Sequence, residues 1–252
     1  MQKIKEWVFE VQQFFFLSFR AIGALLTRPR FPSEMFLQMD AMGVGSINIV
    51  LLTGLFTGMV LALQTALSLE TFGAKNYVGR VVSLSMVREL GPVLTALMVA
   101  GRVGSGIAAE LGSMVVTDQI NAMRAMGSDP LRKLVVPRLV GGLVMVPMLT
   151  ILSDTIGLAG GWLISSVILK IPGSLYFRSS MDALSINEII GGLIKPIVFG
   201  FIIAMVGCYM GLTTTGGTQG VGRSTTQSVV VCSVVVLFTD FLLTRLFFTF
   251  LQ

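Results

Sequence analysis

Histidine is absent from this sequence of 252 residues. Its absence excludes haem ligation by histidine, most zinc sites, serine–histidine catalysis and histidine proton relays, because all of these depend on an imidazole ring. A phosphate-binding loop of the form Gly-x4-Gly-Lys-Ser/Thr is also missing. We therefore expect no catalytic residue, no metal site and no bound cofactor in this chain. If ATP drives its activity, the nucleotide binds to another protein.

Charged residues are scarce, at 12% of the sequence, while 54% of the residues are hydrophobic. A soluble domain carries about 25% charged residues, and the mean hydropathy of this chain is +0.85. The composition predicts an all-α, polytopic membrane protein with a single domain over residues 1–252. At roughly 20 to 25 residues per crossing, this length accommodates about five transmembrane helices. Basic cytoplasmic loops explain the net charge of +5, so we expect no nucleic-acid partner.

Only two cysteines occur, Cys208 and Cys232, and both lie within apolar segments. A disulfide would form only if the two helices that carry them were in contact, and no other feature of the sequence indicates one. We interpret both as small packing residues, which is the usual role of a buried free cysteine.

Five apolar stretches are long enough to cross a membrane. The third exceeds one crossing at about 1.5 Å per residue, so it forms either one tilted helix or a helix with a re-entrant tail around residues 157–161. The glycine-rich segment from Gly211 to Gly222 is interpreted as the turn between the last two spans. The predicted spans are residues 41–69, 81–109, 135–169, 189–212 and 228–250.

The N-terminal segment, residues 3–40, is amphipathic, which is typical of helices that lie in the headgroup layer of a membrane. The alternative is a soluble helix packed on a partner. Lysine and arginine favour the N-terminal side of the membrane by ten residues to four, which places the N-terminus in the cytoplasm and, with five spans, the C-terminus outside. The ten are Lys3, Lys5, Arg20, Arg28, Arg30, Arg124, Arg132, Lys133, Arg138 and Arg223, and the four are Lys75, Arg80, Lys170 and Arg178.

Three charged residues, Glu89, Lys195 and Asp240, lie inside predicted spans at matching depths, roughly 10 to 15 Å from the outer end. Each charged side chain costs about 3 kcal/mol or more in lipid unless it is paired or hydrated. This cost favours a buried ionic cluster in which the three charges pair. The cluster either rearranges when the bundle opens, in which case we call it a latch, or only fixes how the helices pack, in which case we call it a staple. An ion-coupled secondary transporter that uses these charges is the alternative function. Arg88 is expected to point away, towards water or another subunit.

A polar run at residues 110–127, between the second and third spans, is predicted to be a helix on the cytoplasmic side. Apolar and charged side chains are interleaved in it, which favours docking to a soluble subunit over a merely solvated loop helix. The candidate docking residues are Glu110, Asp118, Ile120, Met123, Arg124 and Met126.

Several motifs together resemble the MlaE family of ABC-transporter permeases, from about residue 10 to the C-terminus. The resemblance includes the acid and phenylalanine of the last span, at Asp240 and Phe241. The other motifs are Gly58-Met-Val-Leu-Ala-Leu-Gln64, Arg88-Glu-Leu-Gly-Pro-Val93, Ala100-Gly-Arg102, Ala109-Glu110, Asp129-Pro-Leu-Arg132, Pro137-Arg138 and Ser224-Thr-Thr226.

The resemblance implies a homodimeric permease of the bacterial inner membrane, with an interfacial helix and five spans in each copy. It implies a cytoplasmic ATPase pair that holds ATP and Mg²⁺ and grips the coupling helix, a hexamer of MCE-domain protein in the periplasm, and often a STAS-domain protein. The implied cargo is lipid, typically phospholipid, moved between the inner and outer membranes to maintain outer-membrane lipid asymmetry. By motif position, Leu61 and Leu90 line the lipid pocket and Phe72 lies at its outer rim.

Overall fold

The computed structural model describes residues 2–26 and 31–250, which fold into helices joined by short turns, with no β-strand among them. The predicted link between the N-terminal helices, at residues 27–30, lies outside the described residues. The helices are α1 (Gln2–Leu26), α2 (Pro32–Gly43), α3 (Ile47–Glu70), α4 (Val78–Ser85), α5 (Gly91–Val99), α6 (Ser105–Val116), α7 (Gln119–Ala125), α8 (Val136–Val167), α9 (Gly173–Met181), α10 (Ile186–Leu212) and α11 (Gly217–Phe250).

Short irregular turns join several of these helices into longer ones. A 3-10 turn, η1 (Val44–Ser46), links α2 to α3, and the π-helical turns η3 (Met86–Leu90) and η4 (Ala100–Gly104) link α4, α5 and α6. A further π-helical turn, η5 (Leu131–Val135), leads into α8. The second predicted span is therefore one long helical segment with two π turns, and π turns of this kind are frequent at functional sites.

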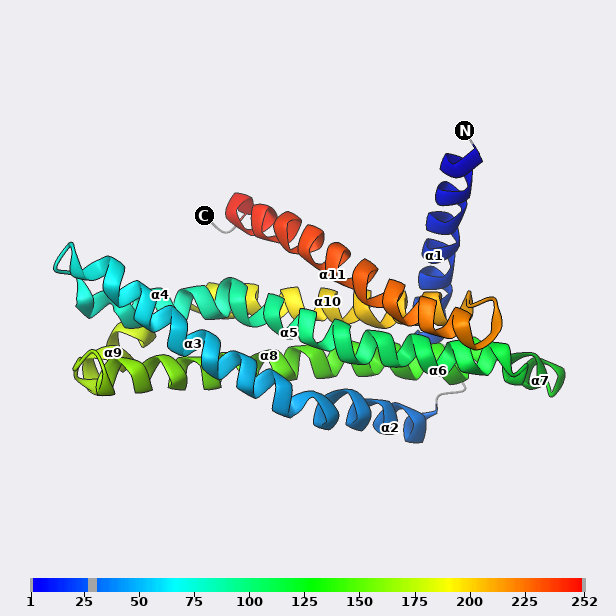
Figure 1. Ribbon diagram of the computed structural model, residues 1–252, viewed down its shortest axis with the longest axis horizontal. Helices are drawn as coiled ribbons and strands as arrows, with labels where there is room; N and C mark the ends of the chain where they lie inside the picture. Colours follow the sequence, from blue (N-terminus) through cyan, green and yellow to red (C-terminus); the bar gives the residue numbers. More distant parts are fainter. Residues whose placement is uncertain (1, 27–30, 251–252) are drawn as a thin grey trace.

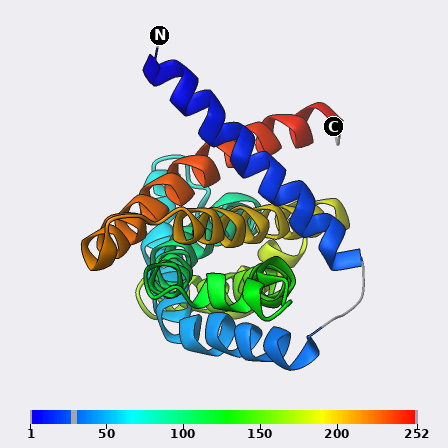
Figure 2. The ribbon, with the colours of Figure 1, turned by 90° about the vertical axis from the view of Figure 1, so that its right-hand side faces the viewer.

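Six helical stretches in the described part of the chain are long and apolar enough to cross a membrane. Five of them overlap the predicted spans, and the first of these, Pro32–Glu70, also takes in residues 32–40, which were predicted to be interfacial. The sixth, Val8–Leu25, lies in the remainder of the segment predicted to be interfacial. Figure 1 shows α3, the α4–α6 segment, α8 and α10 running along one common direction, with α11 inclined to them. Figure 2 shows that α1 instead runs across this bundle.

The third predicted span is one continuous helix, so the alternative of a re-entrant tail is wrong. The helix α8 passes without a break through the glycine-rich residues 157–161 and ends at Val167. Those glycines pack against α3: a Cβ atom on Gly58 would lie 1.9 Å from the carbonyl oxygen of Gly157, and one on Gly160 would lie 2.5 Å from that of Leu55. Small residues here let the two backbones approach, as is usual between membrane helices.

The glycine-rich turn near the C-terminus is shorter than the sequence indicates. The helix α10 ends at Leu212 and α11 already begins at Gly217, so residues 217–222 are helical and the predicted start of the last span at residue 228 is late. Positive φ angles of 88° at Gly216 and 67° at Gly217 turn the chain, which explains why glycine occupies these two positions.

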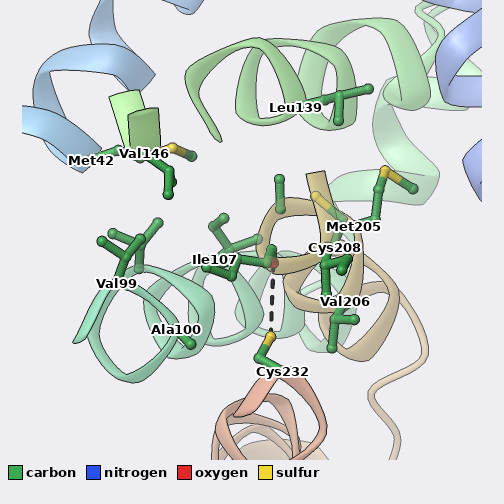
Figure 3. Packing of buried hydrophobic residues seen from close by; sticks show 14 of the residues in the cluster. Met42, Val99, Ala100, Ile107, Leu139, Val146, Met205, Val206, Cys208 and Cys232 are labelled. Atoms are coloured by element: carbon green, nitrogen blue, oxygen red, sulfur yellow. Dashed lines mark hydrogen bonds between the residues drawn. The ribbon is translucent and has the colours of Figure 1, made fainter. Parts of the chain in front are cut away.

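The main hydrophobic core lies between α5, α6, α8 and α10, with α11 covering one side (Figure 3). Cys208 and Cys232 are both free and fully buried in this core, although α10 and α11 are in contact. Their packing role is therefore confirmed. The Cys232 sulfur lies 4.0 Å from the carbonyl oxygen of Ile203, so its thiol makes at most a weak hydrogen bond.

The segment between the third and fourth predicted spans contains a docked helix, α9, that packs on α4. Ser180 Oγ of α9 donates a hydrogen bond of 3.1 Å to the carbonyl oxygen of Gly79. Tyr176 donates one of 3.2 Å to the carbonyl oxygen of Leu158, and burial raises the pKa of Tyr176 to about 12. The phenol therefore stays neutral, and this end of the bundle is tied together by α9.

Candidate functional site

Lys195 of α10 is the centre of a buried ionic cluster. Its Nζ atom lies 2.7 Å from Oε2 of Glu89 and 3.0 Å from Oδ1 of Asp240, and its side chain is only 3% exposed. Thr244 Oγ1 accepts a hydrogen bond of 2.8 Å from Lys195 and donates one of 3.0 Å to Oε1 of Glu89. The prediction that these three charged residues meet is thus confirmed.

Besides its hydrogen bonds to Glu89 and Thr244, Lys195 Nζ donates one of 2.8 Å to backbone, the carbonyl oxygen of Arg88. Pro92 removes one donor that could compete for that oxygen. In a regular α-helix the N–H of residue 92 would bond to the carbonyl of residue 88, and proline has no N–H. Lys195 therefore occupies a vacancy that the Gly-Pro step creates in the neighbouring helix.

The π turn η3 frees a second carbonyl for contact with α10. The N–H of Gly91 bonds to the carbonyl of Met86 rather than to that of Val87. The oxygen of Val87 faces Gly192, where a Cβ atom would lie only 2.4 Å from it. Glycine at this position thus allows α10 to approach the opened backbone, which brings Lys195 within reach of Glu89.

Arg88 does not point to water or to another subunit, as the sequence suggested. Its guanidinium forms a two-pronged ion pair with the carboxylate of Glu188 in the first turn of α10. The signal for this partner was in the sequence: Ser185 caps α10 and accepts a hydrogen bond of 3.4 Å from the N–H of Glu188. A Ser-x-x-Glu pattern marks the start of a helix, so α10 begins at residue 186 rather than 189.

A further acid, Asp154 of α8, lies against the same π turn and was not predicted to belong to the site. A Cβ atom on Gly91 would lie 1.7 Å from Oδ1 of Asp154, so only glycine leaves room for the carboxyl group. That oxygen is buried and has no hydrogen-bond partner within the described residues. The Gly91-Pro92 step is therefore approached by polar side chains from both α8 and α10.

An apolar groove of about 330 Å³ lies between α3 and η3. The structure brings together in it the two leucines predicted to line a lipid pocket, Leu61 and Leu90. Phe72, 82% exposed, lies in the turn after α3, about two helical turns beyond the groove, and is not part of its lining. The lining residues are Phe56, Thr57, Val60, Leu61, Gln64 and Leu90.

The groove and the ionic cluster are held by consecutive residues of η3. Leu90 lines the groove, while Glu89 belongs to the cluster and keeps a side chain that is 39% exposed. Lys195 and Asp240 are more enclosed, at 3% and 17%. The partly open carboxylate of Glu89, backed by a buried ammonium group, thus belongs to the residue next to a lining residue of the groove, although Glu89 itself is not part of the lining.

The predicted cytoplasmic helix at residues 110–127 is divided. Residues up to Val116 continue the second span as α6, and only Gln119–Ala125 form a separate helix, α7. Asp118 makes the turn with a φ angle of 58°, a left-handed conformation that aspartate tolerates, and its Oδ1 accepts a hydrogen bond of 3.0 Å from Asn121.

The expected outward apolar face of this segment is also incomplete. Ile120 is 4% exposed and belongs to the protein's own core, and Met123 packs partly against that core. Met126 alone of the three is widely exposed, at 74%, and Arg124 lines a small hollow beside α1. The surface that remains for a partner is therefore smaller and more polar than the sequence suggested.

Glu110, another residue of the predicted docking segment, has an internal partner. Its Oε2 atom lies 2.7 Å from Nη2 of Arg138, whose side chain is 2% exposed within α8. Arg138 lies in the first turn of α8, and the carboxylate of Glu110 in α6 neutralises its charge. This pair ties the cytoplasmic extension of the second span to the third.

Comparison with known proteins decides the class of this molecule. The chain matches the family described as permease MlaE over residues 35–246. It belongs to the MlaE permease family. The matched range contains the ionic cluster, the groove and α7, whereas the whole of α1 lies before it.

Individual relatives support the same assignment. A probable ABC transporter permease protein of Rickettsia typhi is 40% identical over 235 residues, which are 93% of this chain and 91% of that protein. A protein of the same description from Synechocystis is 44% identical over 211 residues, 84% of this chain and 80% of that protein. The chain is therefore a multi-pass permease of the ABC-transporter type.

A plant relative of the MlaE permease family carries a lipid in its printed name. The chloroplastic protein trigalactosyldiacylglycerol 1 of Arabidopsis thaliana is 39% identical over 211 residues, which are 84% of this chain and 60% of that protein.

Proposed function

We propose that this chain is the lipid-translocating membrane subunit of an ABC transporter. The observation that carries the proposal is the groove at Leu61 and Leu90 with the partly open carboxylate of Glu89 on the adjoining residue. A membrane lipid needs an apolar surface for its acyl chains and polar groups for its headgroup, and this place offers both. The plant relative with a galactolipid in its name supports lipid as the cargo class.

The proposed topology has five spans, with α1 lying in the headgroup layer. Figures 1 and 2 support this arrangement, because α1 runs across the bundle rather than along it. Little of α1 is buried within the protein, as is also true of α11, so α1 presents a wide surface to lipid. The distribution of lysine and arginine places the N-terminus in the cytoplasm and the C-terminus in the periplasm, with the protein in a bacterial inner membrane.

The proposed assembly is a homodimer with partners on both sides of the membrane. A cytoplasmic ATPase pair, which holds ATP and Mg²⁺, grips α7 and the two residues that flank it, through Asp118, Arg124 and Met126. A hexamer of MCE-domain protein receives the lipid in the periplasm, and a STAS-domain protein can join the ATPase. The open side of the groove supports the homodimer, because a second copy would enclose it. The cargo is phospholipid, and its movement maintains outer-membrane lipid asymmetry.

A transfer assay with the purified complex tests this function. The chain is expected to co-purify with an ATPase, and phospholipid transfer from proteoliposomes to acceptor protein should stop when the ATPase carries a substitution in its nucleotide site. Transfer that continues without ATP hydrolysis but follows an ion gradient would support the ion-coupled alternative built on Glu89, Lys195 and Asp240. Mass spectrometry of the co-purified lipids identifies the cargo.

A further inference from the structure

A second, larger hollow lies at the other end of the bundle, between α1, the end of α10 and the start of α11. Its volume is about 1220 Å³, above the range of roughly 300–1,000 Å³ that is usual for small-molecule pockets. Figure 1 shows that this end also carries α7, so it is the proposed cytoplasmic end. The groove at Leu61 and Leu90 shares no lining residue with it.

The lining of this hollow, here called the α1–α11 groove, changes from polar to apolar along α11. Gln219, Arg223 and Gln227 follow one another at intervals of four residues and so lie on one face of the helix, and Val231 continues that face. From Gln219 to Val231 the face spans about 18 Å, at 1.5 Å per residue. The polar part lies nearest the turn at the end of the bundle, and the apolar part lies deeper.

Two opposite charges border the groove, Glu10 on α1 and Arg223 on α11. Neither side chain forms an ion pair with a charged group in the described ranges, 2–26 and 31–250. Both are exposed, so each is available to a ligand. A ligand that carries an anion and a cation on one headgroup matches this arrangement, whereas a purely anionic ligand would meet repulsion from Glu10.

The wall of the groove on the α1 side is fixed rather than loosely placed. Tyr209 of α10 donates a hydrogen bond of 3.2 Å to the carbonyl oxygen of Glu10. The ring of Phe14 meets the ring of Tyr209 edge to face, with centroids 5.7 Å apart. These two contacts hold Glu10 at a defined position opposite α11, which a binding site requires.

We propose that the α1–α11 groove binds a zwitterionic phospholipid of the cytoplasmic leaflet, with its phosphate at Arg223 and its ammonium group at Glu10. The acyl chains then extend along α11 past Val231, and Phe9 and Met210 are further apolar residues of the lining. This inference rests on the proposed function, since it assumes that the protein handles lipid. It adds a lipid site on the membrane face opposite to the groove at Leu61 and Leu90.

Photolabelling of the full complex in nanodiscs tests the site. Nanodiscs carry photoactivatable phosphatidylethanolamine or, in parallel, photoactivatable phosphatidylglycerol, and mass spectrometry maps the labelled peptides. Phosphatidylethanolamine is expected to label residues 9–13 and 219–231. Arg223→Gln should lower this labelling about tenfold, the effect of losing one hydrogen bond to a charged group. Glu10→Gln should abolish the preference for phosphatidylethanolamine over phosphatidylglycerol.

Arg178→Gln is the matched control, because Arg178 is an exposed arginine of α9 that does not line the groove. It should leave the labelling unchanged. Labelling is compared only between variants whose thermal stability equals that of the wild type. Labelling that is absent from the wild type, or equal in wild type and Arg223→Gln, overturns the proposal. So does efficient disulfide linkage of two copies through Gln227→Cys without lipid labelling, because a second copy then fills the groove. Labelling near Leu61, read from the same spectra, tests the proposed function separately.

Discussion

Lys195 Nζ donates a hydrogen bond of 2.8 Å to the carbonyl oxygen of Arg88, on a helix more than one hundred residues earlier in the chain. Pro92, four residues after Arg88, supplies no N–H that could compete for that oxygen. A charged side chain thereby completes the backbone of its neighbour while it pairs with Glu89 and Asp240. The irregular backbone of the second span and the ionic cluster are one structural unit.

Lys195→Met is expected to destabilise the protein by about 3 to 5 kcal/mol, because it leaves Glu89 and Asp240 without a counter-charge in a buried setting. Lipid transfer should fall with it. Thermal unfolding in detergent measures the first effect and the proteoliposome assay measures the second. Lys170→Met, at an exposed lysine beyond α8, is the control and should unfold as the wild type does. Wild-type stability and transfer in Lys195→Met would refute a role for the cluster in either.

The triple variant Lys195→Met, Glu89→Gln, Asp240→Asn separates a staple from a latch. With all three charges removed, no buried charge is left unpaired, so stability is expected to recover to within about 1 to 2 kcal/mol of the wild type. If the cluster is only a staple, transfer recovers together with stability. If the charges rearrange during transport, transfer stays low although the protein is stable, and this second outcome is the one we expect.

Pro92→Ala restores an N–H that competes with Lys195 for the carbonyl of Arg88. Removing a proline from a helix interior gains up to about 3 kcal/mol, so the stability of the protein should stay level or rise. Lys195 loses a hydrogen bond of the charged kind, and we expect lipid transfer to fall about tenfold. Pro147→Ala in α8 removes another proline inside a helix, and in the described part of the chain no charged side chain bonds to the carbonyl four residues before it, so it should leave transfer unchanged. Equal transfer rates in both variants would show that the hydrogen bond from Lys195 to the π turn is not needed for lipid transfer.

The meeting of Glu89, Lys195 and Asp240 was predictable because helices rise by a fixed length per residue, so depth is obtained by counting. The partner of Arg88 was not predicted, since it depends on where α10 begins and on how the π turn rotates the residues around it. The burial of Ile120 could not be predicted either. Three apolar residues at helical spacing look the same whether they face a partner or the protein's own core, and only the packing of α7 on the bundle decides this.

Leu61→Trp is expected to block the groove and to reduce lipid transfer by more than tenfold, without a matching loss of stability. An indole group occupies a large part of a hollow of about 330 Å³, and the groove is open enough to accept it without displacing the core. Leu63→Trp is the control: this side chain is 39% exposed and lies two residues away, on the opposite side of α3. Binding of a fluorescent phospholipid by the purified complex distinguishes the two. Equal loss in both variants would point to a general effect on α3.

Gly58→Ala is expected to destabilise the protein by about 1 to 3 kcal/mol, the usual cost of overpacking a tight contact. The new Cβ atom would lie 1.9 Å from the carbonyl oxygen of Gly157, which is backbone and has no side chain to move aside, so α3 and α8 must separate. Gly23→Ala is the matched control, because a Cβ atom there meets nothing within 4 Å. On the helix α1 this change should raise the free energy of unfolding by up to about 1 kcal/mol through helix propensity alone. The two glycine-to-alanine changes therefore have opposite effects on thermal stability.

The helix α3 also carries Leu61, so its displacement in Gly58→Ala should weaken lipid binding in proportion to the loss of stability. Retained stability in Gly58→Ala would show that α3 and α8 slide freely past each other, contrary to the close backbone contact between them.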